Sequence, residues 1–216
     1  WAQEAYIKAS NNDENDYFGN SAALDDDTLA VGAYREDSNQ TTITNGTSSS
    51  SDNSQSGSGA VYVYKRTGTS WAQEAYIKSS NNDNGANGYS DSFGFRIALD
   101  NETLAVGAYG EDSNQTTITN GTSASSDNSE QDSGAVYVYK RTGSSWAQEA
   151  YLKTSNSDNH NQVGYRVALD GDTLAVTARV DSSNQTTITN GTSSSTNKSN
   201  HYAGAVFVYK RTGSSW

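Results

Sequence analysis

Oxygen-bearing side chains gather in loops that recur along this chain of 216 residues. In the first third, the loop 11–16 (NNDEND) precedes an apolar run, and the loop 36–39 (EDSN) follows the next apolar run. Carboxylate and amide oxygens at this density are ligands that Ca²⁺ prefers, but Asp and Asn also stabilise turns through local hydrogen bonds. We expect the turn role to outweigh the metal role. The aspartates that would serve as Ca²⁺ ligands are Asp13, Asp16, Asp37, Asp83, Asp91 and Asp112.

Eight asparagines stand in the Asn-X-Ser/Thr pattern that accepts N-linked glycans in secreted proteins. They are Asn39, Asn45, Asn101, Asn114, Asn120, Asn184, Asn190 and Asn197. A chain this rich in Ser, Thr and Asn also generates the pattern by chance. The repeated TTITNG segment has a second interpretation, because TTIT favours a strand and Asn-Gly favours a hairpin turn. We expect a β-arm here and leave open whether the arm carries sugar.

Catalytic groups are not singled out by their context. The two histidines, His160 and His201, lie in polar loops, and no nucleophile elbow accompanies them. The carboxylates that a glycosidase needs are plentiful, but they recur with the rest of the pattern. Because the chain has no Cys, thiolate nucleophiles, thiolate metal sites and disulfides are excluded. We expect no enzymatic activity.

The charge and hydropathy of the chain exclude two classes of partner. A net charge of −11 argues against nucleic acid, whose phosphates need clustered Lys and Arg. No apolar stretch approaches the length of a membrane span. The absence of Met leads us to expect that the chain is part of a longer precursor.

All of these candidate residues are carried by one unit that recurs three times, at residues 1–70, 71–145 and 146–216. Each unit opens with WAQEAY and closes with GAVYVYKRTG or GAVFVYKRTG, and Trp216 would open a fourth copy. Self-similarity at a fixed spacing is the signature of a tandem array. We therefore treat each unit as one structural repeat.

Within a unit, apolar residues alternate with a period of two, which indicates β-strands. In the first unit the strand segments are WAQEAYIK (1–8), FGNSAALD (18–25), TLAVGAY (28–34) and GAVYVYK (59–65). The sequence thus predicts an all-β chain of tandem four-stranded antiparallel blades, similar to those of β-propellers. Three blades are fewer than the usual closed ring of four to eight. We expect a longer array, packing between chains, or an open superhelix.

Two short motifs resemble the bacterial type of the FG-GAP repeat family, whose integrin α-chain members are β-propellers. The first motif appears as DYFG (16–19) and DSFG (91–94), the second as VGAY (31–34 and 106–109). The third unit departs from both, with QVGY (162–165) and VTAR (176–179). The resemblance implies propeller-like blades that serve as extracellular scaffolds or ligand platforms.

The integrin relatives hold calcium in a D-x-D-x-D-G loop, and this part of the resemblance does not transfer. The corresponding turns here are DDDT (25–28), DNET (100–103) and DGDT (170–173). They are too short to wrap a Ca²⁺ ion, which takes six to eight oxygen ligands.

Two further patterns recur at alternate strand positions. Tyrosines there favour packing between blades over a carbohydrate-binding groove; they are Tyr62, Tyr64, Tyr137, Tyr139 and Tyr209. The Lys-Arg pairs 65–66, 140–141 and 210–211 are expected to form a repeated ion-pair seam with acidic residues of neighbouring units or chains.

These features favour an extracellular or cell-surface structural protein whose blades stack into a longer array or filament. Its partners would be copies of itself or further repeats, because a head-to-tail contact that does not close gives a fibre. The alternative is a secreted propeller that serves as an adhesion or carbohydrate-binding module, with Ca²⁺ as a conceivable cofactor.

Overall fold

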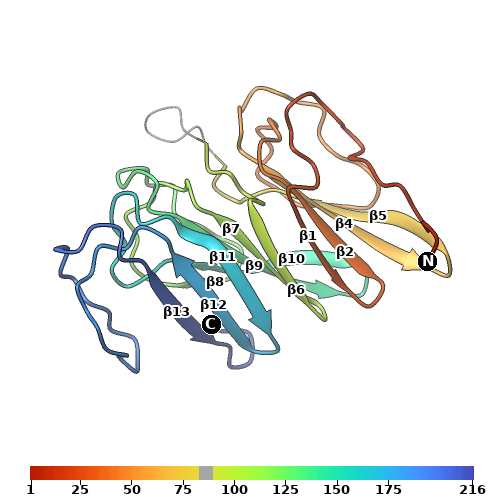
Figure 1. Ribbon diagram of the computed structural model, residues 1–216. Helices are drawn as coiled ribbons and strands as arrows, with labels where there is room; N and C mark the ends of the chain where they lie inside the picture. The colour runs from red at the N-terminus through yellow and green to blue at the C-terminus, as the bar shows by residue number, and fades with distance from the viewer. Residues whose placement is uncertain (83–89) are drawn as a thin grey trace.

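A computed structural model describes residues 1–82 and 90–216 and shows three antiparallel sheets side by side in chain order (Figure 1). The first sheet has the order β1-β2-β4-β5-β3, and the second repeats this order as β6-β7-β9-β10-β8. The third has the order β11-β12-β13, and none of the three closes on itself. The predicted all-β architecture of tandem blades is therefore confirmed.

The strands of corresponding units have nearly the same bounds, as expected from the repeated sequence. The first sheet is made of β1 (Ser21–Asp25), β2 (Thr28–Ala33), β3 (Thr44–Asn45), β4 (Ala60–Thr67) and β5 (Ser70–Ile77). The second is made of β6 (Arg96–Asp100), β7 (Thr103–Ala108), β8 (Thr119–Asn120), β9 (Ala135–Thr142) and β10 (Ser145–Leu152). The third is made of β11 (Val163–Asp170), β12 (Thr173–Ala178) and β13 (Ala205–Lys210).

The sheets and the sequence repeats are out of phase. Trp71 opens the second sequence unit, but it lies in β5, where it pairs with Arg66 of β4 in the first sheet. The cause is the tight turn after Thr67, which folds the Trp strand back onto the strand before it. The first and second sheets therefore take their fourth strand from the unit that follows.

This phase has one consequence at each end of the molecule. Residues 1–8, which the sequence predicted to form a strand, lie outside all sheets of the described chain. That prediction was wrong: the same sequence in the second unit forms β5 by pairing with β4, which precedes it, and the described chain gives residues 1–8 no such partner. At the other end, the third sheet has three strands and lacks the counterpart of β5 and β10.

Two of the three apolar clusters of the described residues lie between neighbouring sheets, and the third packs Tyr62 and Tyr64 of the first sheet against residues 7–18. Val61, Val63 and Ile77 of the first sheet form one cluster with Phe93 and Leu104 of the second unit. A second cluster joins the second and third sheets in the same way and includes Val136, Val138, Leu174 and Val176. Thin cores repeated along the chain suit a sequence with 32% hydrophobic residues.

Glycine permits the closest approach between sheets. A Cβ added at Gly32 would overlap the carbonyl oxygen of Gly94, and one added at Gly107 would overlap that of Gly164. Both pairs lie where β2 or β7 passes the start of the next sheet. The third unit carries Thr177 at the corresponding position.

Candidate functional site: the junctions between sheets

The Ser/Thr/Asn-rich excursion returns to its own sheet and forms a short fifth strand. In β3, Thr44 pairs with Tyr76 and Asn45 with Ala75 of β5, and β8 pairs with β10 in the same register. Only a two-residue strand of the predicted arm forms in the first two units, and Asn45 and Asn120 lie in that strand, paired with β5 or β10, instead of forming the expected hairpin turn. The third sheet has no outer strand for an arm to pair with, and Ile188 of the corresponding arm is exposed.

The asparagine at the tip of each docked arm holds the backbone of the following sheet. The Oδ1 atom of Asn45 accepts a hydrogen bond from the amide N–H of Trp146 at 2.8 Å. Its Nδ2 donates to the carbonyl of the same residue at 3.3 Å. Asn120 accepts from the N–H of Trp216 at 3.0 Å in the next junction. The Asn45 side chain thus forms hydrogen bonds with both the N–H and the carbonyl group of a tryptophan about one hundred residues away in sequence.

The asparagines of all eight sequons are exposed to solvent. They are Asn39, Asn45, Asn101, Asn114, Asn120, Asn184, Asn190 and Asn197. Exposure is the condition that glycan attachment requires. At Asn45 and Asn120 the same side chain also serves the junction.

An ammonium–carboxylate pair is buried in each of the first two sheets. The Nζ atom of Lys78 lies 2.7 Å from the Oε2 atom of Glu36, and neither side chain is more than 1% exposed. The Lys78 ammonium also donates to Ser58, and Tyr76 donates its hydroxyl proton to Glu36. The arrangement recurs with Lys153 and Glu111, at 2.8 Å.

This pair joins residues of two consecutive sequence units, because Lys78 follows β5 and Glu36 follows β2. Burial lowers the pKa of Lys78, while the Glu36 carboxylate opposes that shift. Sequence analysis treated Glu36 only as part of an oxygen-rich loop. The missed signal was the Lys two residues after the Tyr of each WAQEAY segment.

The aspartates predicted as Ca²⁺ ligands do not converge on one point. The Oδ1 atom of Asp37 accepts a hydrogen bond from the N–H of Gly57 at 2.7 Å, and Asp112 accepts from the N–H of Asp132 at the same distance. Asp13 is exposed and accepts from Asn53. These contacts tie together loops that lie 20 to 40 residues apart in the sequence, rather than closing local turns as expected, and the residues do not fit a Ca²⁺ cage.

The remaining aspartates complete this picture. Asp16 accepts a hydrogen bond from the N–H of Asp13, and Asp91 is buried at the corresponding position of the second unit. Asp83 lies outside the described residues. Burial raises the pKa of Asp16 to about 6, and the nearby Glu36 carboxylate adds to the shift. Over residues 1–82 and 90–216, no group of three or more His, Cys, Asp or Glu side chains is placed to hold a metal ion.

The predicted ion-pair seam runs along the junctions. Arg141 of β9 contacts Glu74 of β5 through two parallel bonds, with Nη2–Oε1 at 2.6 Å and Nε–Oε2 at 2.8 Å. The indole N–H of Trp146 donates to the same carboxylate at 3.1 Å. In the next junction Glu149 likewise accepts from Arg211 and Trp216, but Arg211 reaches it through Nη1 alone, at 3.2 Å, and directs its Nε to Asp172. A fork-shaped pair such as that of Arg141 with Glu74 fixes orientation as well as distance.

The same seam is weaker at the start of the chain. There Arg66 lies 3.4 Å from Glu4, and the two side chains are 35% and 40% exposed. In the inner junction the corresponding Arg141 and Glu74 are 14% and 10% exposed. The contact of residues 1–8 with the first sheet is therefore a longer and more exposed form of the inner seam.

Tyrosines at alternate strand positions pack between and behind the sheets, as predicted. Tyr62, Tyr64, Tyr137 and Tyr139 are buried, and Tyr209 is half-buried. Their hydroxyls bind the segment that leads into their own sheet: Tyr139 donates to the carbonyl of Lys78 at 3.2 Å. A carbohydrate groove along these residues is excluded, since the rings are covered.

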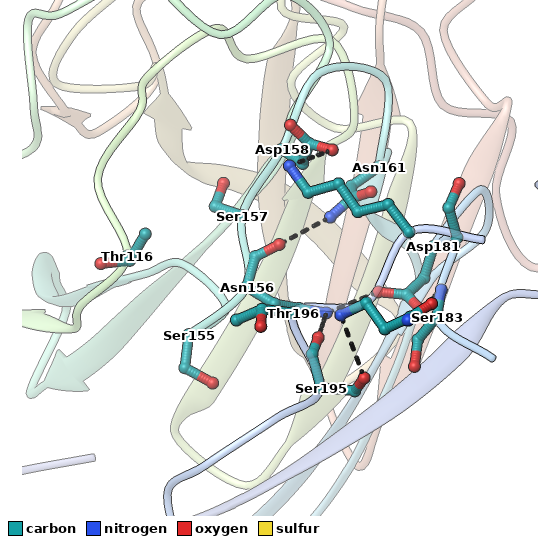
Figure 2. Close-up of a pocket in the computed structure, with 13 residues that line it drawn as sticks. Thr116, Ser155, Asn156, Ser157, Asp158, Asn161, Asp181, Ser183, Ser195 and Thr196 are labelled. Carbon is teal, nitrogen blue, oxygen red and sulfur yellow. Dashed lines mark hydrogen bonds and ion pairs between the residues drawn. The ribbon is translucent and has the colours of Figure 1, made fainter. Parts of the chain in front are cut away.

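The third sheet has an open face where the first two have a junction. Val206 and Val208 of β13 are 64% and 67% exposed, whereas Val61 and Val63 at the same positions are fully buried. Beside this sheet lies a cavity of about 240 Å³ whose lining includes Asp181, Ser183 and Lys198 (Figure 2). Asp181 stands at the position of Glu36 and accepts a hydrogen bond from Asn156 at 2.7 Å.

A row of aromatic rings marks the inner strands of the sheets, and sequence analysis did not identify it. The centroid of the Phe95 ring lies 5.3 Å from that of Tyr34, 4.7 Å from that of Tyr109 and 5.3 Å from that of Tyr165. Guanidinium groups cover these rings: Arg96 lies over Phe95 at 4.2 Å, and Arg179 over Tyr165 at 4.8 Å. Burial lowers the pKa of Arg96, and the neighbouring Arg166 adds to the shift.

The two histidines take no part in these clusters. His160 is exposed and contacts Asp132 at 3.1 Å, and His201 is exposed in a loop of the third unit. The part of the chain that the structure describes also contains no helix of the length and apolarity that a membrane crossing requires.

Comparison with known proteins places this architecture in a family. No curated protein matches the chain. The FG-GAP repeat family matches residues 1–49 and 71–139, which together make up more than half of the chain. The matched residues include both short motifs of the first two units and the strands β1, β2, β6 and β7. The chain therefore belongs to the FG-GAP repeat family.

Proposed function

We propose that this chain is a structural repeat module of an extracellular or cell-surface protein, and that its blades continue into a longer array or filament. Its partners are copies of itself or further repeats. The observation that carries this proposal is that the two internal junctions are built alike, while the two ends of the molecule carry the unmatched halves of such a junction.

The unmatched half at the start of the chain is apolar. Leu24 of β1 is 63% exposed, whereas Leu99 at the same position of the second sheet packs against the core of the first junction. Tyr6 is 81% exposed, whereas Tyr76 is fully buried. The open face at Val206 and Val208 supplies the other half. Exposed apolar positions that are covered in each internal junction support a further sheet at both ends.

Surface decoration is part of the same proposal. The eight exposed sequon asparagines lie on loops and arms, where N-linked glycans would not displace the cores between sheets. The proposed role requires no catalysis.

A second candidate function is an adhesion or carbohydrate-binding module. The row of Tyr34, Phe95, Tyr109 and Tyr165, with arginines over the rings, favours it. The guanidinium groups that lie over these rings bind carboxylates. An acidic oligosaccharide fits that chemistry best.

Sedimentation velocity over a wide range of protein concentrations tests the first function. We expect species larger than the 216-residue chain to grow with concentration, as a head-to-tail contact demands. A single species of monomer size at every concentration would contradict the proposal. Titration with an acidic oligosaccharide, followed by the intrinsic fluorescence of the chain, tests the second.

A further inference from the structure

We propose that residues 2–8 of a second copy add as a fourth strand to the outer edge of β13. This inference rests on the proposed assembly function and names the contact that carries it. The segment WAQEAYIK occurs unchanged at residues 1–8 and 71–78. In its second occurrence it forms β5, the outer strand of the first sheet.

The register of the added strand follows from the first sheet. There Val61 pairs with Ile77, Tyr62 with Tyr76, and Val63 with Ala75. The same positions in β13 are Val206, Phe207 and Val208, and the same positions in the incoming segment are Ile7, Tyr6 and Ala5. Unpaired backbone groups at such an edge are a template for strand addition, and the alternating side chains set the register.

Half of the required junction already exists at the start of the chain. The hydroxyl of Tyr64 donates to the carbonyl of Lys8 at 3.1 Å, as that of Tyr139 does to Lys78. In the internal junction, Lys78 also sends its ammonium into the preceding sheet, where it meets Glu36. Lys8 has no preceding sheet, and its side chain is exposed.

The cavity beside the third sheet offers the missing partner for Lys8. Asp181, which is 2% exposed, lines the cavity at the position that Glu36 holds in the first sheet (Figure 2). Ser183 lines it as well and corresponds to Ser38, whose carbonyl accepts a hydrogen bond from Asn82 at 2.8 Å. Asn12 of the incoming copy stands at the position of Asn82. The added segment would therefore fill the cavity with a lysine and an asparagine.

The third unit also differs from the others at this face, and the differences shape the proposed contact. Thr177 replaces the glycine that lets the inner strands approach, and Ala203 replaces the Ser58 hydroxyl that binds Lys78. Trp216 already fills the place of the first Trp, where its indole donates to Glu149. The joint between copies is thus held at the outer edge by strand pairing, and it is weaker than the internal junctions.

Disulfide trapping tests the register, since the chain has no Cys of its own. A chain with Ala5→Cys is mixed with a tagged chain with Val208→Cys under mild oxidation. Because Ala75 and Val63 are directly paired, we expect a mixed disulfide dimer. The matched control replaces Val208→Cys by Val206→Cys, two residues out of register. No mixed dimer, or equal yields from both mixtures, would overturn the proposal.

Two further measurements separate this inference from the function on which it rests. Sedimentation that shows larger species without the mixed disulfide would overturn the strand addition and leave the array in place. Absence of both would overturn both. Lys8→Glu in the Ala5→Cys chain places a carboxylate against Asp181, and we expect a roughly tenfold lower yield of mixed dimer. An unchanged yield would overturn the proposed contact of Lys8 with Asp181 in the cavity. Melting curves of each single variant establish that the variant folds.

Discussion

The buried pair of Lys78 and Glu36 ties one sequence unit to the next. Desolvation of two charges costs several kcal/mol, so the pair persists only because Tyr76, Ser58 and Asn11 complete its hydrogen bonds. Removing one partner leaves the other charge buried without compensation. The pair therefore fixes the position of the segment that directly follows β5, where Lys78 lies.

Lys78→Met keeps most of the side-chain volume and removes the charge. We expect a loss of about 3 kcal/mol in the free energy of unfolding, measured by urea denaturation, because Glu36 would stay buried without its cation. Lys65→Met is the matched control. Lys65 is half-buried and donates only to Thr28 in the described chain, so its loss should cost below about 1 kcal/mol. Equal losses in the two variants would contradict this account of the pair.

The raised pKa of Asp16 predicts that the free energy of unfolding falls as the pH rises. Its pKa rises from 3.8 to about 6 on folding, so the folded state binds the proton more tightly than the unfolded state does. This contribution to stability is fully present below about pH 4 and is lost as the pH rises through about 6. The third unit carries Asn161 at this position.

Asp16→Asn should therefore raise the melting temperature at about pH 8 and leave it unchanged at about pH 2.5, where wild-type Asp16 is almost fully protonated in both states. The measurement is a series of thermal melts across this pH range. Glu14→Gln, at an exposed position, is the control and should show no such trend. A benefit of Asp16→Asn that is the same at both pH values would contradict the assigned pKa.

At the scale of strands and arms, the seam and the arm asparagines decide how tightly two sheets dock. The Glu74 carboxylate accepts hydrogen bonds from Arg141 and Trp146. Glu4, its counterpart in the first unit, forms an ion pair with Arg66 at a more exposed position. Glu74→Gln should lower the free energy of unfolding by roughly 2 kcal/mol, and Glu4→Gln by less than about 0.5 kcal/mol. Denaturant midpoints of the two variants measure the difference. Similar midpoints would show that the inner seam contributes no more than an exposed pair.

The arm asparagine can be tested with the repeat as its own control. Asn45→Ala removes both hydrogen bonds to Trp146 and should lower the midpoint of thermal unfolding by a few degrees, equivalent to about 1 kcal/mol. Asn190 stands at the same place in the third unit, where the arm forms no strand and the side chain is exposed. Asn190→Ala should leave the midpoint within experimental error, and an equal effect of both changes would contradict the clamp.

The strands themselves could be predicted from the sequence, but their grouping into sheets could not. A period of two in GAVYVYK and TLAVGAY identifies strands, because only alternate side chains face the core. A repeat, however, reads the same from any starting point, so the pattern cannot say whether Trp71 opens a blade or closes the one before it. The hairpin after Thr67 settles this, and it places residues 1–8 outside all sheets of the described chain.

The side-chain clusters at the junctions could be predicted only where a short sequence pattern contains the residues that form them. The basic residues of the seam stood out as Lys-Arg pairs in each unit. The pair of Lys78 with Glu36 and the row of Phe95, Tyr109 and Tyr165 join residues that lie far apart in the sequence. Their partners are fixed by how the sheets stack, which no short motif records.

At the scale of the whole molecule, the described chain is a run of three sheets with two unlike open ends. One end offers an unpaired WAQEAYIK segment, and the other offers the edge of β13 with the cavity at Asp181. A contact between unlike surfaces is heterologous, so it extends an array or closes a ring according to the rotation at each step. Thr177 favours a wider step at the joint between copies than at the internal junctions, because its Cβ occupies the space that Gly32 leaves free.

Cryo-electron microscopy of the assembled native material tests the central claim most directly. The account predicts continuous rows of blades in which each copy follows the last head to tail, with a fourth strand of density along the outer edge of β13. It also predicts that this strand belongs to the neighbouring copy. Particles of three blades with a bare β13 edge, at concentrations where larger species sediment, would contradict the account.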